Sequence, residues 1–153
     1  MKALMSFFIF LFVLSACNND EIYKNTKKFP NEIWTYNDVF SSDFSIKQDT
    51  AHYDIFLGIN HTENYPFQNI YLKITDDFTG SLNTDTININ FYDKSGIIIG
   101  EKQGKNHYLN TLLRKSFKFP KSGNYSIKIE QLTRKDSLEG ISDIKFKILQ
   151  SSK

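Results

Sequence analysis

Aliphatic and aromatic side chains recur at every second position in several short segments, and this period of two residues constrains the fold more than any other feature of the chain. Ile70, Leu72 and Ile74 form one such series. Successive side chains of a β-strand point to opposite faces of a sheet, so the pattern is typical of strands that bury one face. Comparable segments lie at residues 44–46, 53–59, 86–92, 117–119, 125–129 and 144–148, and residues 97–99 form a short continuous apolar run.

Residues that favour turns separate these segments. The turn signals are Asp93–Gly96, Pro120–Gly123 and Leu138–Gly140. We expect Gly96 and Gly123 to adopt a positive φ, which glycine tolerates without steric cost. No apolar pattern with a period of 3.6 residues predicts a substantial helix, and residues 110–115 are compatible with a single helical turn. The chain is therefore predicted to be all-β, an antiparallel β-sandwich of about eight short strands with an immunoglobulin-like or jelly-roll-like topology.

The N-terminus has the three parts of an export signal. Met1-Lys2 supplies a positive charge, and the apolar run Ala3–Leu14 is too short to span a bilayer, which takes about 20 residues. Leu14-Ser15-Ala16-Cys17 follows, with small residues directly before the cysteine. This is the pattern of a lipoprotein signal, so we predict a signal peptide over residues 1–16 and acyl chains on Cys17 that anchor the protein in a membrane.

The predicted anchor has consequences for the rest of the chain. Cys17 is the only cysteine, so its acylation excludes a disulfide framework, and the fold must depend on its hydrophobic core. The formal net charge of +2 falls by one when Lys2 is removed with the signal, and a balance so close to neutrality gives no support for a nucleic-acid partner. The polar residues after Cys17 predict a tether over 17–33 and a β-sandwich domain over 34–153.

The sequence contains no convincing catalytic or metal-binding motif. The histidines are His52, His61 and His107. They are far apart and lack metal-ligand spacing, so we interpret each as a surface or loop residue. Asp76, Asp77 and Asp85 lack the spacing of a calcium loop and are interpreted as solvated turn residues. We therefore predict a protein that is not an enzyme and that carries no cofactor and no metal.

Aromatic residues offer the alternative of a binding surface. The candidates are Trp34, Tyr36, Tyr65, Phe67 and Tyr71. Trp34, Phe67 and Tyr71 either close the ends of the core or belong to an exposed patch, and on a lipid-anchored protein such a patch favours a protein partner over a sugar. Several late lysines and arginines alternate with apolar positions, as on the solvated face of a half-buried sheet, and contact with a partner or with anionic headgroups is the alternative.

Landmarks along the whole chain resemble one protein family, the GldH gliding-motility lipoproteins of the Bacteroidota. They are Cys17, Phe29-Pro30-Asn31 with Trp34, Asn64 to Leu72, Asp85-Thr86, Asp93 to Gly96 with Gly100, Phe119-Pro120 with Gly123 and Tyr125, Glu130-Gln131 with Arg134, and Leu138 to Ile144. The family often has aromatic residues where this chain has Ile33 and Ile97-Ile98.

The resemblance implies a non-enzymatic, lipid-anchored envelope protein, in the outer membrane, that assists gliding and type IX secretion through contacts with other envelope proteins. Trp34, Tyr65, Phe67 and Arg134 are the candidate partner contacts, and Arg134 is also expected to bond Glu130 or Asp143. The alternative function is a lipid-anchored carbohydrate-binding module of a glycan-uptake system.

Overall fold

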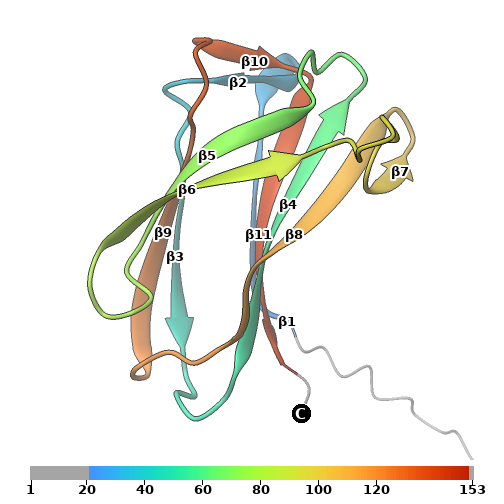
Figure 1. Cartoon of the computed structure of the whole chain (residues 1–153). Coiled ribbons are helices and arrows are strands. Elements are labelled where there is room, and N and C mark those ends of the chain that lie inside the picture. The colour runs from blue at the N-terminus through green and yellow to red at the C-terminus, as the bar shows by residue number, and fades with distance from the viewer. Residues whose placement is uncertain (1–20, 152–153) are drawn as a thin grey trace, which may run out of the picture.

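The computed structural model describes residues 21–151, which form two antiparallel β-sheets packed face to face (Figure 1). The first sheet has the order β1 (Glu21–Lys28), β11 (Ile141–Gln150), β4 (Tyr53–Thr62), β8 (Asn106–Phe117) and β7 (Glu101–Gln103). The second has the order β3 (Phe40–Ile46), β9 (Gly123–Gln131), β5 (Asn69–Asp76) and β6 (Asn83–Asn90). A short 3₁₀ turn, η1 (Pro30–Glu32), leads into β2 (Ile33–Thr35), which pairs with β10 (Ser137–Glu139). The prediction of an antiparallel β-sandwich is confirmed.

Aromatic rings from both sheets form the centre of the core. Phe44 of β3 lies 5.7 Å from Phe146 of β11, and 5.6 Å from Phe78, between ring centroids. Phe119 completes this group at 6.0 Å from Phe44. The alternating apolar residues of β4, β9 and β11 are buried because the pleat turns every second side chain towards the opposite sheet.

Two local predictions are wrong. Residues 110–115 form no helical turn, because they lie within β8 and pair with β4. Residues 97–99 form no buried strand: Ile97 is 65% exposed, and Ile98 makes one isolated bridge to Tyr92. This segment follows the turn Asp93–Gly96, where Gly96 has the expected positive φ of 79°, and Gly123 also has a positive φ, of 151°.

The first strand changes the predicted domain boundary. Residues 21–28, assigned to a tether from their polar composition, form β1 and pair with β11 from Glu21 to Lys28. The side chains of β1 that face inward hold the second sheet: Tyr23 hydrogen-bonds Ser42 at 2.7 Å, and Lys27 donates to the carbonyl oxygen of Val39 at 3.0 Å. A polar strand is thus stabilised at the edge of a sheet, and the tether prediction is wrong from Glu21 onwards.

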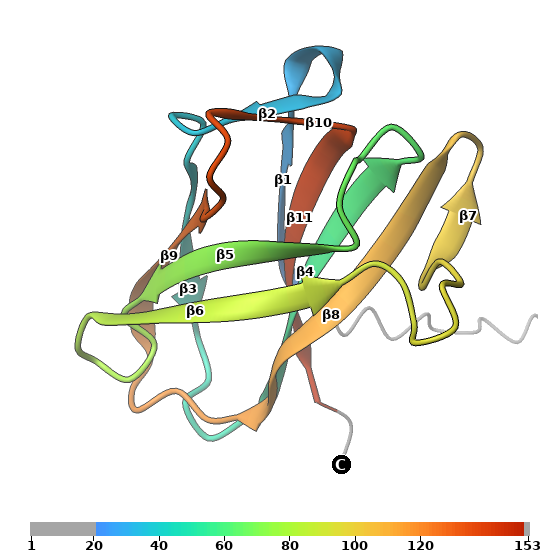
Figure 2. The ribbon, with the colours of Figure 1, turned by 45° about the horizontal axis from the view of Figure 1, so that its top comes forward.

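The antiparallel order gives the sandwich two distinct ends, which Figures 1 and 2 show from two sides. The lower end in Figure 1 contains the start of β1, the end of β11 and the loops β3–β4 and β8–β9. The upper end contains β2, β10 and the loops β4–β5 and β9–β10. The predicted signal peptide and Cys17 lie outside the described residues. Within residues 21–151, no helix has the length and apolar character needed to cross a bilayer.

Candidate functional site

Trp34 is a core residue. Its side chain is fully buried, and its ring stacks on Phe29 with 4.8 Å between centroids. Its indole N–H donates a hydrogen bond to the carbonyl oxygen of Asp38 at 2.9 Å, which satisfies its one polar atom. The prediction that Trp34 contacts a partner is therefore wrong for the folded domain, because the indole has no surface to offer.

Tyr65, Phe67 and Arg134 line one groove of about 480 Å³ at the upper end of the second sheet. Tyr65 forms the base: it is only 4% exposed, and its hydroxyl donates to the carbonyl oxygen of Asn69 at 2.9 Å. Phe67 packs edge-on against Tyr65, with 5.7 Å between ring centroids, and stays 38% exposed. Tyr71 of β5 is 48% exposed beside them. This wall presents accessible aromatic surface on a fixed support.

The β9–β10 loop supplies the opposite wall through residues 132–135. The amide of Gln131 donates to the carbonyl oxygen of Lys135 at 3.1 Å, and Leu132 N donates to Tyr71 O at 2.8 Å. Because Gln131 is buried, these bonds fix the loop to the sheet. Leu132 is 42% exposed and extends the apolar surface of the groove.

Arg134 does not make the predicted bonds to Glu130 or Asp143. Glu130 instead pairs with Lys73 at 2.9 Å, and Asp143 accepts both of its hydrogen bonds from the Asn60 amide, at 3.1 and 3.0 Å. Within residues 21–151, neither Arg134 nor Lys135 takes part in an ion pair. The groove therefore joins an aromatic wall to two available cations, an arrangement that suits a ligand with apolar and anionic groups.

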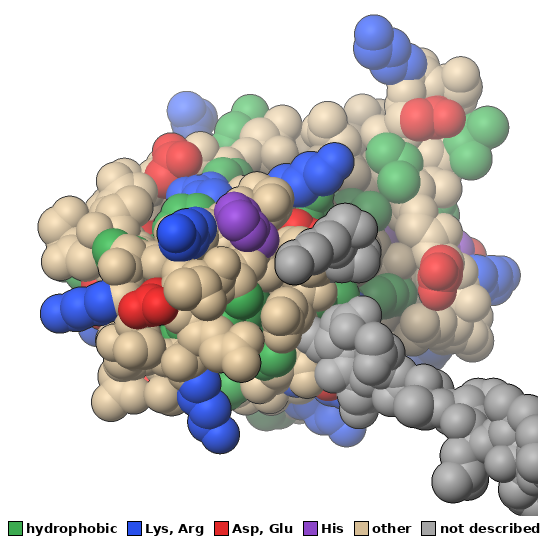
Figure 3. Space-filling model, turned by 90° about the horizontal axis from the view of Figure 1, so that it is seen from below, with side chains coloured by type: hydrophobic (Ala, Val, Ile, Leu, Met, Phe, Trp, Pro, Cys, Tyr) green, Lys and Arg blue, Asp and Glu red, His purple; other side chains and the backbone are tan. Residues whose placement is uncertain are grey.

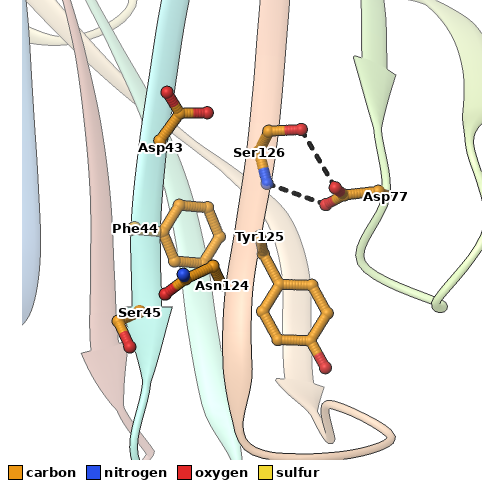
Figure 4. A pocket seen from close by; sticks show the side chains of 7 residues that line it. All are labelled: Asp43, Phe44, Ser45, Asp77, Asn124, Tyr125 and Ser126. Atoms are coloured by element: carbon orange, nitrogen blue, oxygen red, sulfur yellow. Dashed lines mark hydrogen bonds between the residues drawn. The ribbon is translucent and has the colours of Figure 1, made fainter.

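A second hollow, of about 610 Å³, lies on the outer face of β3 and β9 (Figure 4). Asp77 accepts hydrogen bonds from Ser126 N at 2.7 Å and Ser126 Oγ at 3.0 Å. Asp43 stands on the neighbouring strand β3 and takes no part in these bonds (Figure 4). The serine hydroxyl donates to a carboxylate, without a histidine lining the hollow to activate it. Asp77 thus fastens the β5–β6 loop to β9.

Two of the three histidines contradict the prediction of surface positions. His61 and His107 are opposite each other on β4 and β8, are 1% and 8% exposed, and have ring centroids 5.7 Å apart. Burial holds the pKa of His61 below its usual value, with a smaller contribution from His107 in the same direction. Their spacing in sequence gave no signal, because only the β4–β8 register brings them together. His52 is exposed, as predicted.

The acidic residues also differ in part from the prediction. Asp76 is 4% exposed, so it is not a solvated turn residue, and burial raises its pKa against the opposing effects of the Phe78 N–H and Arg114. Arg114 lies 3.8 Å from the Asp76 carboxylate. Asp85 is exposed. In the described part of the chain, no three histidine, aspartate or glutamate side chains form a cluster suited to a metal.

Comparisons with known proteins identify sequence relatives. The model of the family described as GldH lipoprotein matches residues 21–148. A protein of Christiangramia forsetii named gliding motility lipoprotein GldH homolog is 26% identical over 162 aligned residues, covering 99% of each chain. The gliding motility lipoprotein GldH of Flavobacterium johnsoniae is 25% identical over 151 residues, covering 90% of each chain.

Solved structures give only a distant likeness. The mosquito-larvicidal Cry4Aa toxin of Bacillus thuringiensis aligns with a TM-score of 0.47 and 12% identity, over 85% of this chain and 21% of the toxin. The carbohydrate-binding module TmCBM61, solved with β-1,4-galactotriose, aligns with a TM-score of 0.30 and 10% identity, over 88% of this chain and 97% of the module.

Proposed function

The chain belongs to the GldH lipoprotein family, and we propose that it is a non-enzymatic accessory protein of gliding motility and type IX secretion, anchored by lipid in the outer membrane. The family match over residues 21–148 carries this proposal, because it covers almost the whole described domain. The names of the two relatives assign them to gliding motility. The acyl chains on Cys17 would confine the domain to the membrane surface, where it meets other envelope proteins.

The groove of Tyr65, Phe67, Tyr71 and Arg134 is the contact surface that we assign to this role. Its exposed rings provide area that a partner buries at low entropic cost, since aromatic side chains have few rotatable bonds. Arg134 and Lys135 give it a positive rim. The partner segment that fits is an extended peptide with an apolar side chain next to an acidic one.

Deletion of the gene in the bacterium that encodes it tests the role of the whole protein. We expect loss of spreading on agar and loss of surface adhesins, with both restored by the wild-type gene. A deletion strain that spreads and exports adhesins normally would refute the proposed function.

Substitutions in the groove test the contact surface. Phe67→Ala and Arg134→Glu should reduce spreading while the amount of protein in the membrane stays normal, because both side chains are exposed. Leu82→Ala and Lys94→Glu are matched controls, because both residues are exposed and lie outside the groove, and Leu82 is 75% exposed. If the groove variants and the controls spread equally well, the groove is not the contact surface.

One observation favours the alternative of a carbohydrate-binding module. The exposed ring of Tyr71 adjoins Asn69, whose amide donates to Asn88 Oδ1 at 2.7 Å. A sugar can stack on such a ring while its hydroxyl groups bond to the neighbouring side-chain amides. A glycan array with unlipidated residues 18–153 separates the two functions. Strong binding that Tyr71→Ala abolishes would favour the carbohydrate module, and absence of binding favours the accessory protein.

A further inference from the structure

Two histidines lie face to face in the interior of the sandwich, at its upper end. His61 of β4 and His107 of β8 are opposite each other in register, and both are buried. Within residues 21–151, the Nε2 atoms of the two rings are buried without a hydrogen-bond partner. The other nitrogen of His61, Nδ1, lies 3.4 Å from the carbonyl oxygen of Thr62. A neutral imidazole leaves one nitrogen unbonded here, whereas a charged one would bury its charge and two N–H donors.

The groups around His61 do not supply an anion to balance such a charge. The carboxylate of the β4–β5 loop belongs to Glu63, and its Oε1 lies 3.9 Å from Nε2 of His107. The residue opposite His61 on β11 is the apolar Ile141. The titratable groups on the surrounding elements are Glu63, Tyr65, His107, Lys102 opposite His107, the ion pair of Lys105 with Glu32, and Asp93, which bonds within its own turn. Among the described residues, no carboxylate bonds to the His61 ring.

A series of ring contacts joins His61 to the base of the groove. The His61 ring lies 4.2 Å from that of Phe91 and 6.4 Å from that of Tyr65, between centroids. Phe91 packs edge-on against Tyr65 at 5.1 Å, and Tyr65 contacts Phe67 at 5.7 Å. His61 therefore supports, from the interior, the two aromatic residues that form one wall of the groove.

Backbone bonds near His61 hold the loop that carries these rings. Tyr65 N donates to Thr62 O at 3.1 Å, and Thr62 N donates to Gly140 O at 2.8 Å. The Thr62 carbonyl oxygen thus lies within hydrogen-bond distance of both the Tyr65 amide and the His61 ring. The opposite wall of the groove is held by separate bonds, such as that from Leu132 N to Tyr71 O. A change at His61 therefore reaches one wall of the groove and not the other.

We infer that His61 is a proton-sensitive support of the groove: a proton on its ring releases the β4–β5 loop with Tyr65 and Phe67, so that the groove loses its aromatic wall at acidic pH. This inference concerns regulation of the contact surface and rests on the proposed function. Charging His61 in place would bury a cation without a carboxylate, whereas an open loop lets the ring reach water. The open loop is the form that binds the proton more readily, and acid increases its population.

The direction of the pH dependence follows from the burial of the ring. Burial holds the pKa of His61 below its usual value, the Thr62 carbonyl opposes this effect, and His107 adds to it. In the open loop the solvated ring titrates near its ordinary value of about 6.5. The loop population is therefore constant above that pH, and the open fraction rises as the pH falls below it, by at most about tenfold for each pH unit.

Amide hydrogen exchange followed by NMR between pH 8 and pH 5 tests the inference on the full mature chain with Cys17→Ala, which lacks only the lipid. Each exchange rate is compared with that of an unstructured peptide at the same pH, so the resulting protection factor reports opening of the structure. We expect the protection factor of the Tyr65 amide to fall by up to about tenfold per pH unit below pH 6.5. The Leu132 amide on the opposite wall should keep its protection, and Ile127 in the core should stay far better protected than Tyr65.

Two histidine variants identify the group responsible. His61→Gln should remove the pH dependence at Tyr65, and His52→Gln should retain it. His52 is exposed in the β3–β4 loop at the lower end of the sandwich, and Figure 3 shows a histidine side chain open to solvent at that end. If His61→Gln does not fold, the comparison of Tyr65 with Leu132 in the otherwise unchanged chain still decides.

Three results would overturn the inference. They are a Tyr65 protection factor that is constant from pH 8 to pH 5, one that falls in parallel with that of Leu132 or equals that of Ile127, and a pH dependence that persists in His61→Gln. The measurement involves no partner. A deletion strain that spreads normally would therefore refute the proposed function and leave the behaviour of the loop standing, whereas a loop that ignores pH leaves the proposed function intact.

Discussion

At the scale of single residues, burial decides which of the candidate side chains can act at the surface. Trp34 and Tyr65 are both landmarks of the family resemblance, yet one is enclosed and the other forms the base of a groove. Phe67 and Arg134 remain accessible. Three of the four candidates, Tyr65, Phe67 and Arg134, line one groove, and the sequence could not tell which of them is buried beneath it and which is exposed in it.

Replacement of Trp34 by alanine should destabilise the domain strongly. The substitution leaves a cavity beside Phe29, and removing a buried tryptophan costs about 3–5 kcal/mol. Chemical unfolding followed by circular dichroism measures this loss. Tyr36→Ala is the control, since Tyr36 is 54% exposed, and it should change the free energy of unfolding little. Equal stability of the two variants would contradict the burial of Trp34.

The buried histidine predicts a fall in stability at acidic pH. The pKa of His61 is lowered in the folded state, so below its ordinary value of about 6.5 the unfolded chain binds the proton more readily. The contribution is fully present above that pH and is lost as pH falls below it, by at most about 1.4 kcal/mol per pH unit.

Unfolding in urea between pH 8 and pH 5 measures this dependence. His61→Gln should flatten the curve, and His52→Gln, a change at an exposed loop residue, should leave it unchanged. If His61→Gln and the wild type show the same dependence of the free energy of unfolding on pH, protonation of the buried His61 is not its cause.

At the scale of elements, backbone contacts explain positions that the alternation of side chains cannot. Gly140 has φ +82°, and a Cβ at this residue would lie 2.4 Å from the backbone nitrogen of Tyr65. The absence of a Cβ lets the β4–β5 loop, and with it the base of the groove, pack against the turn between β10 and β11, where Thr62 N donates to Gly140 O at 2.8 Å. Gly96 has a similar φ of +79° but has no atom within 4 Å of an added Cβ.

This pair of glycines allows steric contact to be separated from backbone strain. Gly96→Ala should cost about 1–2 kcal/mol, from the positive φ alone. Gly140→Ala should cost about 1–3 kcal/mol more, because backbone atoms of the β4–β5 loop must move to admit the methyl group. Thermal unfolding of both variants measures the difference. Equal losses would mean that the β4–β5 loop yields freely.

The edge strand β1 should be required for a stable fold. A chain that starts at Phe29 lacks Tyr23, whose ring lies 5.4 Å from Phe44, and it leaves β11 as an unprotected edge. We expect it to unfold at a lower temperature than a chain that starts at Glu21, and to aggregate on size-exclusion chromatography. If the two chains unfold at the same temperature and neither aggregates, residues 21–28 are dispensable for the fold and act as part of the tether.

At the scale of the whole molecule, the predicted lipid anchor determines where the protein meets its surroundings. Acylation of Cys17 should be visible as incorporation of a clickable palmitate analogue into the protein. Cys17→Ala should abolish the label, because the chain has no other cysteine. Labelling that persists in Cys17→Ala would contradict the anchor, while circular dichroism of purified protein checks that the domain is unchanged.

The class of fold, most of the strands and the family could be predicted from the sequence, because side-chain alternation is a local property and the landmarks are read in chain order. The packed structure was needed to show that the polar segment Glu21–Lys28 is a strand, that His61 and His107 are buried together, and that Arg134 borders a groove. These features depend on strand register across long sequence separations. Whether a side chain is buried or exposed depends on the strands that pack against it, and the sequence of one segment does not specify those neighbours.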